Sequence, residues 1–307
     1  MIGSIGAEFP TLKMPDGNDI PVVAYGLGSA RQRGPGKPRD ETLVRLTEMA
    51  LSCGYRHVDG AQIYGNEEEQ GDGIRASGVP RDKIFVTTKY SGADPRTSIT
   101  TAFAGSLERL GLDYVDLYLI HMPYWASTKE ELQQQWAEME AIKESGRAKS
   151  IGVSNYLQEH LEVILAAAKI KPAINEIEYH PYLQQNGLLE FHRTNDIAVS
   201  CYGALVPLTK APGGPVDGLW SELARKYNVT ESEIGLRWVL DQGCVAVTTS
   251  SRKERLEGFV RKLPTFKLTE DEISDIAALG RKRQRFRGYL RKYFDPVDQK
   301  LGHSIDY

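Results

Sequence analysis

The sequence predicts an α/β protein whose eight parallel strands close into a (β/α)₈ TIM barrel. Three observations lead to this fold class. Short apolar runs rich in β-branched residues alternate with longer amphipathic stretches. The alternation repeats every 25 to 40 residues or so, at roughly the spacing of strand-helix units. No Pro/Gly/Ser-rich linker divides the chain, so we expect residues 1–307 to form one domain with a substantial core.

An N-terminal β-hairpin is expected first, because Asp16 and Gly17 give residues 15–18 the composition of a tight turn. The barrel strands are then expected at residues 22–27, 56–60, 84–90, 115–121, 149–154, 173–179, 197–203 and 245–250. Helical periodicity is clearest at residues 41–53, 98–110, 129–145, 157–168 and 231–241.

Composition and charge exclude several classes of function. The chain is 41% hydrophobic and 26% charged, as in an ordinary soluble globular protein. Its net charge of −3 gives no overall field that would recruit nucleic acid or an anionic membrane. No apolar run approaches the roughly 18 residues of a spanning helix, and residues 1–10 lack the pattern of a signal peptide. We expect a cytoplasmic protein with no nucleic-acid or membrane partner.

The three cysteines are expected to be reduced core residues. Cys53, Cys201 and Cys244 are odd in number, far apart in the chain, and without C-x-x-C spacing. They therefore predict neither a disulfide nor a metal site.

Candidate catalytic residues follow the ends of three strands. Active sites of this fold lie at the carboxyl ends of the strands, where the sequence places Asp59, Tyr64, Lys89 and His121. Each alone has an ordinary explanation, a packed tyrosine or a solvated charge, but four at one end of the barrel favour a site.

Their chemistry is mutually consistent. A phenol with an ordinary pKa of about 10 is a poor acid at neutral pH, and a nearby ammonium such as Lys89 lowers that value. Asp59 compensates the charge of a desolvated Lys89, while His121 can hydrogen-bond a substrate oxygen. The set suits a reaction in which an oxygen gains a proton as its carbon gains a hydride. The sequence shows no metal-binding motif and no activated Ser or Cys nucleophile.

The usual dinucleotide fingerprint is missing. Gly26 and Gly28 are followed by Ser29, Ala30 and Arg31, which do not complete G-x-G-x-x-G, and no phosphate-binding P-loop motif occurs. Any nucleotide therefore binds here without a Rossmann loop.

Five segments resemble successive motifs of the aldo-keto reductase superfamily, in order and over nearly the whole chain to about residue 279. They are residues 54–68, 86–90, 115–123, 149–155 and 175–184. The resemblance implies a (β/α)₈ barrel that binds NADPH/NADP⁺ and reduces a small-molecule carbonyl substrate. It also implies a catalytic tetrad, which falls on Asp59, Tyr64, Lys89 and His121.

The resemblance carries the cofactor site over residue by residue. Ser154 and Asn155 match the pair that holds the nicotinamide carboxamide, Tyr202 matches the aromatic that stacks on the ring, and Glu176 stands where the family commonly has Gln. Further cofactor contacts are expected from Gly28, Ser29 and Leu205.

At the adenosine 2′-phosphate, Thr249 replaces the usual lysine while Ser250 and Arg255 match the family's serine and arginine. Arginine suits phosphate and adenine stacking, and Ser251, Arg252 and Lys253 could make up for the missing lysine. A capped helix start exposed to solvent would explain the serines but not the three basic residues.

The C-terminal region contains seven basic residues and no acidic one at 281–292. We expect a solvated segment packing through Phe286, Tyr289 and Leu290, rather than a nucleic-acid patch, with the tail 293–307 forming a loop at the barrel mouth.

Substrate preference is predicted from Ala30 and Met122, which stand where relatives often carry tryptophan, and from neighbouring Tyr90. A larger pocket lined by flexible Met would suit α-dicarbonyls, ketolactones or other bulky ketones. Here the chain is similar to fungal conjugated polyketone and ketopantoyl lactone reductases. The alternative is a slow or non-catalytic nucleotide-binding regulatory subunit on the same barrel. We expect a monomer or weak homodimer.

Overall fold

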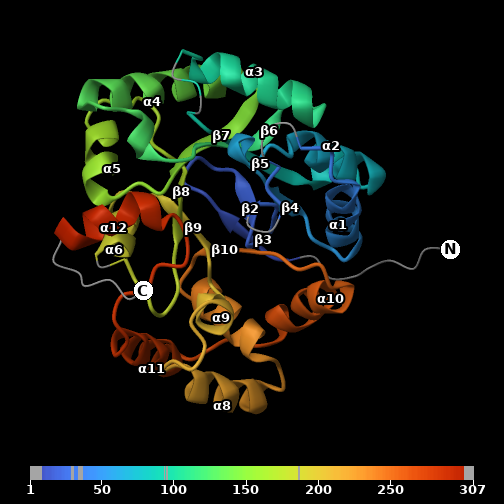
Figure 1. Ribbon diagram of the computed structural model, residues 1–307, viewed down its shortest axis with the longest axis vertical. Helices are drawn as coiled ribbons and strands as arrows, with labels where there is room; N and C mark the ends of the chain where they lie inside the picture. Colours follow the sequence, from blue (N-terminus) through green and yellow to red (C-terminus); the bar gives the residue numbers. More distant parts are fainter. Residues whose placement is uncertain are drawn as a thin grey trace.

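A computed structural model describes residues 9–28, 31–33, 37–92, 94, 96–185 and 187–300, with the backbone alone for 297–300. Eight parallel strands close into a barrel, and Figure 1 shows the helices arranged around it. The barrel strands are β3 (Val23–Gly26), β4 (His57–Asp59), β5 (Phe85–Tyr90), β6 (Val115–Ile120), β7 (Ala148–Ser154), β8 (Ile174–Glu178), β9 (Ala198–Tyr202) and β10 (Val245–Thr248). The predicted barrel is confirmed.

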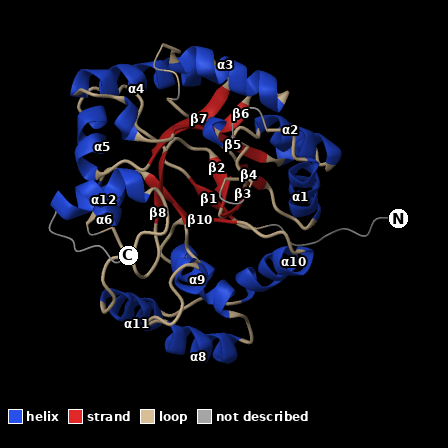
Figure 2. Ribbon diagram, in the orientation of Figure 1, coloured by secondary structure: helices blue, strands red, loops and turns tan. Residues whose placement is uncertain are grey.

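The strands follow one another around the barrel in chain order, and β10 pairs with β3 to close it. This order brings the carboxyl ends of all eight strands to one end of the barrel. Figure 2 shows the strands at the centre and the helices outside them.

The helices that follow the strands bury one apolar face each. In α1 (Glu41–Ser52), for example, Asp40 caps the first turn and Leu43, Ala50 and Leu51 are buried. The other helices are α2 (Glu67–Ala76), α3 (Ile99–Leu110), α4 (Lys129–Glu144), α5 (Gln158–Leu165), α6 (Leu188–Thr194), α7 (Val206–Thr209), α8 (Asp217–Tyr227), α9 (Glu231–Leu240), α10 (Lys253–Lys262), α11 (Glu270–Arg281) and α12 (Arg291–Lys300). Short 3₁₀ turns are η1 (Gln62–Tyr64), η2 (Arg81–Lys83), η3 (Pro123–Trp125) and η4 (Leu263–Thr265).

The N-terminal hairpin closes the amino end of the barrel. Strands β1 (Thr11–Lys13) and β2 (Asp19–Pro21) are antiparallel, and Gly17 has the positive φ of 89° that the predicted turn needs. Met14 and Ile20 are almost fully buried, in a small apolar cluster with residues of the barrel strands such as Phe85 and Leu119. A larger cluster holds the helices against the outside of the strands.

The C-terminal region contains more structure than a loop. Residues 282–290, here called the C-terminal strap, join α11 to α12. Phe286 and Tyr289 pack on the core as predicted, whereas Leu290, with a left-handed φ of 52°, is not among the described residues that pack there. Arg287 is only 3% exposed, so the segment is not wholly solvated. Helix α12 brings Tyr293 onto Tyr124 of η3, with ring centroids 5.8 Å apart. Residues 301–307 of the predicted tail lie outside the described residues.

The described part of the chain contains no helix long and apolar enough to cross a membrane. All three cysteines are free and buried, as predicted.

Candidate active site

Three charged side chains meet inside the carboxyl end of the barrel. Lys89 Nζ donates hydrogen bonds to Asp59 Oδ1 (2.6 Å) and to the Gly60 carbonyl (3.0 Å), and lies 3.2 Å from Glu176 Oε1. Their side chains are 0%, 4% and 6% exposed for Lys89, Asp59 and Glu176. The predicted pairing of Asp59 with Lys89 is present, and Glu176 adds a second carboxylate.

The charges within this cluster shift the pKa values of its members. Burial alone would lower the pKa of Lys89, but the carboxylates of Asp59 and Glu176 outweigh burial and raise it, so Lys89 stays an ammonium. Burial, followed by the charge of Asp59, raises the pKa of Glu176 to about 8.

Tyr64 lies at the mouth beside this cluster, at the end of η1. Lys89 Nζ is 5.9 Å from the centre of its ring. A Cβ atom on Gly28 would lie 2.5 Å from Tyr64 Cζ, so only glycine leaves room for the phenol. Burial raises the pKa of Tyr64, while Lys89 acts in the opposite, predicted direction without overcoming it. Tyr64 is therefore a phenol at neutral pH.

His121 follows β6 and faces Tyr64, with ring centroids 5.6 Å apart and planes nearly perpendicular. Burial, with help from the charge of Lys89, lowers its pKa well below the ordinary value, so the imidazole is neutral. Its Nδ1 atom is buried and has no hydrogen-bond partner among the residues that the structure describes. A neutral imidazole of this kind can donate to a substrate oxygen.

Asn155 connects several of the predicted cofactor residues. It adopts a left-handed φ of 63° directly after β7. Its Nδ2 donates to the His121 carbonyl and to Ser154 Oγ, both at 3.0 Å, and its Oδ1 accepts from Tyr202 Oη at 2.7 Å. Ser154 Oγ donates to the Glu176 carbonyl at 2.9 Å. These groups form a hydrogen-bonded network that runs from β7 to β9.

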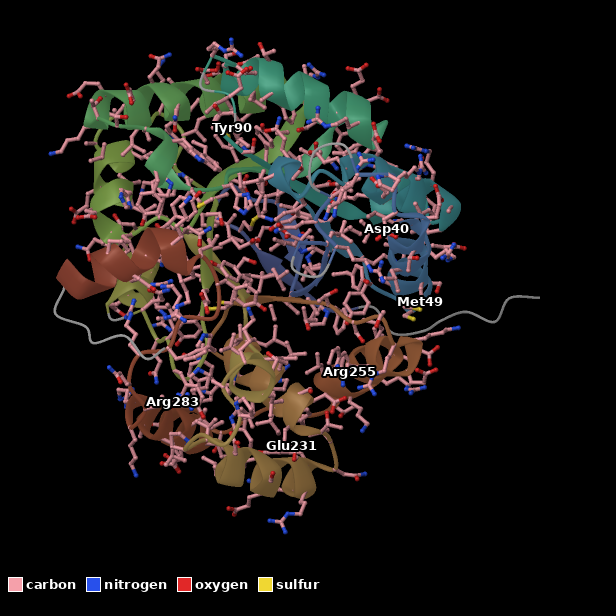
Figure 3. The ribbon with its side chains drawn as sticks, viewed as in Figure 1. Asp40, Met49, Tyr90, Glu231, Arg255 and Arg283 are labelled. Atoms are coloured by element: carbon pink, nitrogen blue, oxygen red, sulfur yellow. The ribbon has the colours of Figure 1, made fainter. Side chains whose placement is uncertain are left out.

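A cavity of about 160 Å³ lies beside several of the residues predicted to bind the adenosine 2′-phosphate. Thr249, Ser250 and Ser251 line it after β10, together with Arg31 from the loop after β3. Arg252 donates its backbone N–H to Ser250 Oγ at 3.0 Å. Arg255 is exposed on α10 (Figure 3) and has no ion-pair partner in the described part of the chain.

The predicted substrate positions are only partly seen. Ser29 and Ala30 lie outside the described residues. Met122 is 2% exposed, and Tyr90 is buried with its hydroxyl donating to the Thr97 carbonyl at 3.3 Å. Tyr90 contacts the mouth through Trp125, whose ring lies 5.9 Å from Tyr90 and 6.3 Å from His121.

Sequence reasoning missed Trp125, Arg31 and the contact of Glu176 with Lys89. Trp125 supplies an indole near the position where Met122 implied that one had been lost. Gly92 leaves the space for this ring, since a Cβ atom there would lie 2.2 Å from it, but a glycine in the sequence does not by itself predict a neighbouring indole. The contact of Glu176 with Lys89 needs the barrel itself, because strands far apart in the sequence must first be brought together.

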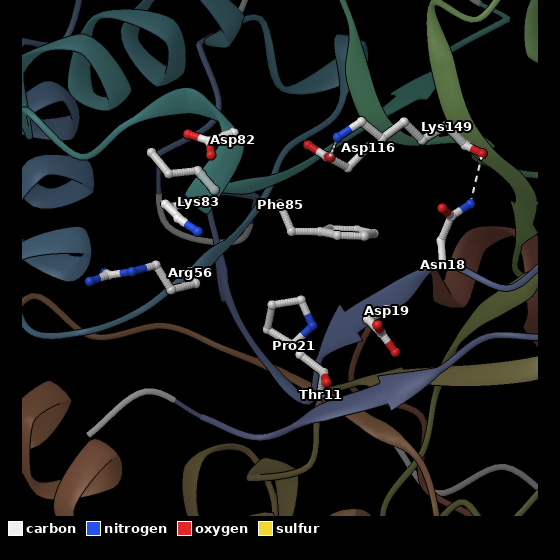
Figure 4. Close-up of a pocket in the computed structure, with 11 residues that line it drawn as sticks. Thr11, Asn18, Asp19, Pro21, Arg56, Asp82, Lys83, Phe85, Asp116 and Lys149 are labelled. Atoms are coloured by element: carbon white, nitrogen blue, oxygen red, sulfur yellow. Dashed lines mark hydrogen bonds and ion pairs between the residues drawn. The ribbon is translucent and has the colours of Figure 1, made fainter. Parts of the chain in front are cut away.

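A larger cavity, about 270 Å³, lies at the opposite, hairpin end of the barrel (Figure 4). Two of the charged residues that line it pair with each other, Lys149 with Asp116 at 3.0 Å. Residues at the amino end of such barrels usually serve stability, so we place the candidate site at the other end.

Comparison with known proteins agrees with this geometry. Residues 22–281 match the model of the aldo/keto reductase family. An NAD/NADP-dependent indole-3-acetaldehyde reductase of Schizosaccharomyces pombe is 37% identical over 268 residues, which cover 86% of this chain and 93% of that protein. An NADPH-dependent alpha-keto amide reductase of Saccharomyces cerevisiae is 36% identical over 308 residues, covering 95% and 96%.

Solved structures are similar as well. The crystal structure of a Bombyx mori aldo-keto reductase in complex with NADP matches with a TM-score of 0.80 at 32% identity, over 94% of this chain and 98% of that one.

Proposed function

The chain belongs to the aldo/keto reductase family, and from this premise we propose that it reduces ketones or aldehydes with NADPH, with Tyr64 as proton donor. The protein is an oxidoreductase that acts on carbonyl groups. The observation that carries the proposal is the meeting of a protonated Tyr64, a neutral His121 and a buried Lys89–Asp59 pair at one end of the barrel.

The described residues fit a nicotinamide dinucleotide. Ser154 and Asn155 offer hydroxyl and amide groups suited to the carboxamide, and Tyr202 offers an aromatic ring. Ser250 and the exposed Arg255 suit the adenosine 2′-phosphate, beside the cavity that Arg31 lines. Thr249 and Leu205 are proposed as further contacts.

The reaction adds one hydride and one proton to a carbonyl group. NADPH, held by Ser154, Asn155, Tyr202, Ser250 and Arg255, would supply the hydride that the carbonyl carbon gains and would become NADP⁺. Tyr64 Oη gives its proton to the carbonyl oxygen, so the C=O bond becomes a C–O bond with a new O–H bond. The Lys89 ammonium stabilises the resulting phenolate, which regains its proton from solvent.

His121 orients the substrate in this proposal. Being neutral, it can donate a hydrogen bond to the carbonyl oxygen without competing with Tyr64 as an acid. Asn155 fixes the backbone of His121 through its carbonyl.

For the substrate we propose α-dicarbonyls, ketolactones or other bulky ketones. The alpha-keto amide reductase among the relatives supports a carbonyl beside a second carbonyl. Trp125 offers an aromatic wall next to His121 for a planar substrate of this kind. The relatives named above are all reductases, so they give no support to a regulatory subunit without activity.

The test is NADPH oxidation by the wild type and by Tyr64→Phe, with α-diketones, ketolactones and simple aldehydes as substrates. The variant should bind NADPH nearly as well as the wild type, while kcat falls by at least about 100-fold, because the proton donor is lost. The matched control is Tyr227→Phe, since the Tyr227 hydroxyl bonds Glu272 on the outer helices. A Tyr64→Phe enzyme with wild-type kcat under conditions where chemistry limits the rate would remove Tyr64 from the mechanism.

A further inference from the structure

Glu176 brings a second carboxylate to a lysine that already has one. The side chains come from three strands, Asp59 from β4, Lys89 from β5 and Glu176 from β8. With both carboxylates ionised the buried cluster carries a net charge of −1, which is costly in a site this far from water.

Two carboxyl groups this close tend to share a proton. Asp59 Oδ2 is buried and lacks a hydrogen-bond donor among the residues that the structure describes. The carboxyl group of Glu176 is within hydrogen-bonding reach of Asp59, and a proton on Glu176 would supply the missing donor. Burial and the nearby Asp59 charge, which raise the pKa of Glu176 to about 8, agree with this arrangement.

The arrangement also accounts for the hydrogen bonds of Lys89. An ammonium has three N–H donors, and three oxygens, from Asp59, Gly60 and Glu176, lie within 3.2 Å of Nζ. No hydrogen bond joins Lys89 to the Tyr64 hydroxyl in the described structure. Glu176 therefore occupies the third N–H donor of Lys89, which would otherwise be available to the Tyr64 hydroxyl.

We propose that Glu176 is a positioning residue for proton transfer, which shares a proton with Asp59 at neutral pH and adds a negative charge in alkaline solution that keeps Tyr64 in its phenol form. This inference rests on the proposed role of Tyr64 as the proton donor.

The direction in which Glu176 shifts the pKa of Tyr64 follows from their charges. When Glu176 loses its proton to solvent, the new negative charge disfavours a second one on Tyr64, so the pKa of Tyr64 rises as the solution becomes alkaline. Carbonyl reduction needs the phenol, whereas oxidation of the product alcohol needs the phenolate. Ionised Glu176 therefore extends the pH range of reduction upward, and oxidation needs a higher pH.

Other ionisable groups near Glu176 do not change charge in the same range. Burial raises the pKa of both Cys201 and Tyr202 on β9 well above their ordinary values, and burial keeps His121 neutral. Lys89 stays an ammonium. The titratable and charged groups that face Glu176 are thus Asp59, Lys89, Tyr64, Cys201 and Tyr202, with His121 beyond Lys89.

The test uses Glu176→Gln, which keeps the shape and hydrogen bonds of a protonated glutamate but cannot ionise. We would measure kcat/KM for NADPH-dependent ketone reduction, and for oxidation of the product alcohol with NADP⁺, from about pH 6 to the highest pH at which the protein stays folded, because burial raises the pKa of Tyr64 above its ordinary value of about 10. Each profile is normalised to its own maximum. In the variant, the alkaline fall of reduction and the alkaline rise of oxidation should both move to lower pH, by about one unit.

Glu140→Gln is the matched control. Glu140 is 6% exposed on α4, away from the barrel mouth, and its carboxylate accepts the backbone N–H groups of Lys169 and Ile170. Its normalised profiles should coincide with those of the wild type, because that carboxylate does not face Tyr64.

A second measurement keeps the inference testable if Glu176→Gln does not fold. Infrared difference spectra of the wild type should show a protonated carboxyl group at neutral pH that is lost in mildly alkaline solution. Absence of this band, or coinciding wild-type and Glu176→Gln profiles, would overturn the role of Glu176. A wild type that reduces no carbonyl with NADPH would instead overturn the proposed function.

Discussion

At the scale of single residues, two glycines shape the mouth of the barrel. Gly28 leaves the space that the Tyr64 ring occupies, and Gly92, with a positive φ of 58°, leaves the space for Trp125. Any side chain at either position would meet an aromatic ring at less than a van der Waals distance. The position of the Tyr64 phenol thus depends on the absence of a Cβ atom at Gly28.

Arg255 is the residue on which we expect cofactor choice to depend. Replacing it with alanine should weaken NADPH binding by about 10-fold or more and change NADH binding little, because only NADPH carries the 2′-phosphate. Fluorescence titration with both cofactors measures this. Arg261→Ala, at the far end of the same α10, is the control. Equal losses for the two cofactors would show that Arg255 does not select the phosphate.

The sequence placed the four candidate catalytic residues at or just beyond strand ends because strand ends and residue types are local signals. Asp59, Lys89 and His121 all close or follow expected strands, and the structure brings them together with Tyr64. Trp125 and Arg31 come from loops, whose paths depend on contacts elsewhere. No single-sequence pattern places their side chains.

At the scale of elements, a buried carboxylate contacts three successive residues of the C-terminal strap, in addition to the bond from Lys210 Nζ to the Gly288 carbonyl at 2.7 Å. Glu178, at the end of β8, accepts the backbone N–H groups of Gly288 (2.6 Å) and Tyr289 (3.2 Å) and lies 3.9 Å from an Arg287 nitrogen. Tyr289 in turn packs edge-on against Tyr202, with centroids 5.6 Å apart. The strap is thereby tied to the residue proposed to stack on nicotinamide.

Glu178→Gln should loosen the strap, since a neutral amide accepts these hydrogen bonds less strongly than a carboxylate. Trypsin reports this directly, because the seven basic residues at 281–292 provide its cleavage sites. We expect cleavage there to be several-fold faster in the variant. Glu190→Gln, at an exposed position of α6, should be cleaved like the wild type. Unchanged cleavage in Glu178→Gln would mean that other contacts hold the strap.

The eight barrel strands were predicted, and so were α1, α3, α4, α5 and α9, because the periodicity of side chains along an element is a local signal. The other helices were not among the expected segments, and at α12 Pro296 and a charged composition gave no helical signal. Its aromatic side chains pack on η3, and tertiary contact overrides the weak local preference.

At the scale of the whole molecule, the N-terminal hairpin completes the barrel core. Besides Met14 and Ile20, polar contacts fix its turn: Lys143 of α4 donates to Asp16 Oδ2 at 2.9 Å, and Asn18 donates to the Lys149 carbonyl at 3.0 Å. We propose that hairpin and barrel unfold together, as one domain.

Ile20→Ala should therefore lower the free energy of unfolding of the entire protein by about 2 to 5 kcal/mol, the range for a buried Ile truncated in a core. Urea denaturation followed by far-ultraviolet circular dichroism should show one transition at lower urea. Thr11→Ala, exposed on the same hairpin, should unfold like the wild type. An early separate transition would show that the hairpin unfolds independently.

The closed amino end of the barrel also limits the side from which a proton can reach Tyr64. Apolar side chains of the hairpin and strands fill the barrel between Lys89 and the hairpin, so we propose that the proton that Tyr64 would give up is replaced from the mouth. With its amino end closed, the barrel is open only at its mouth, so substrate, product and water would all reach the site from that side. In this proposal the reprotonation of Tyr64 waits until the product has left, so each turnover ends only after water has returned to the mouth.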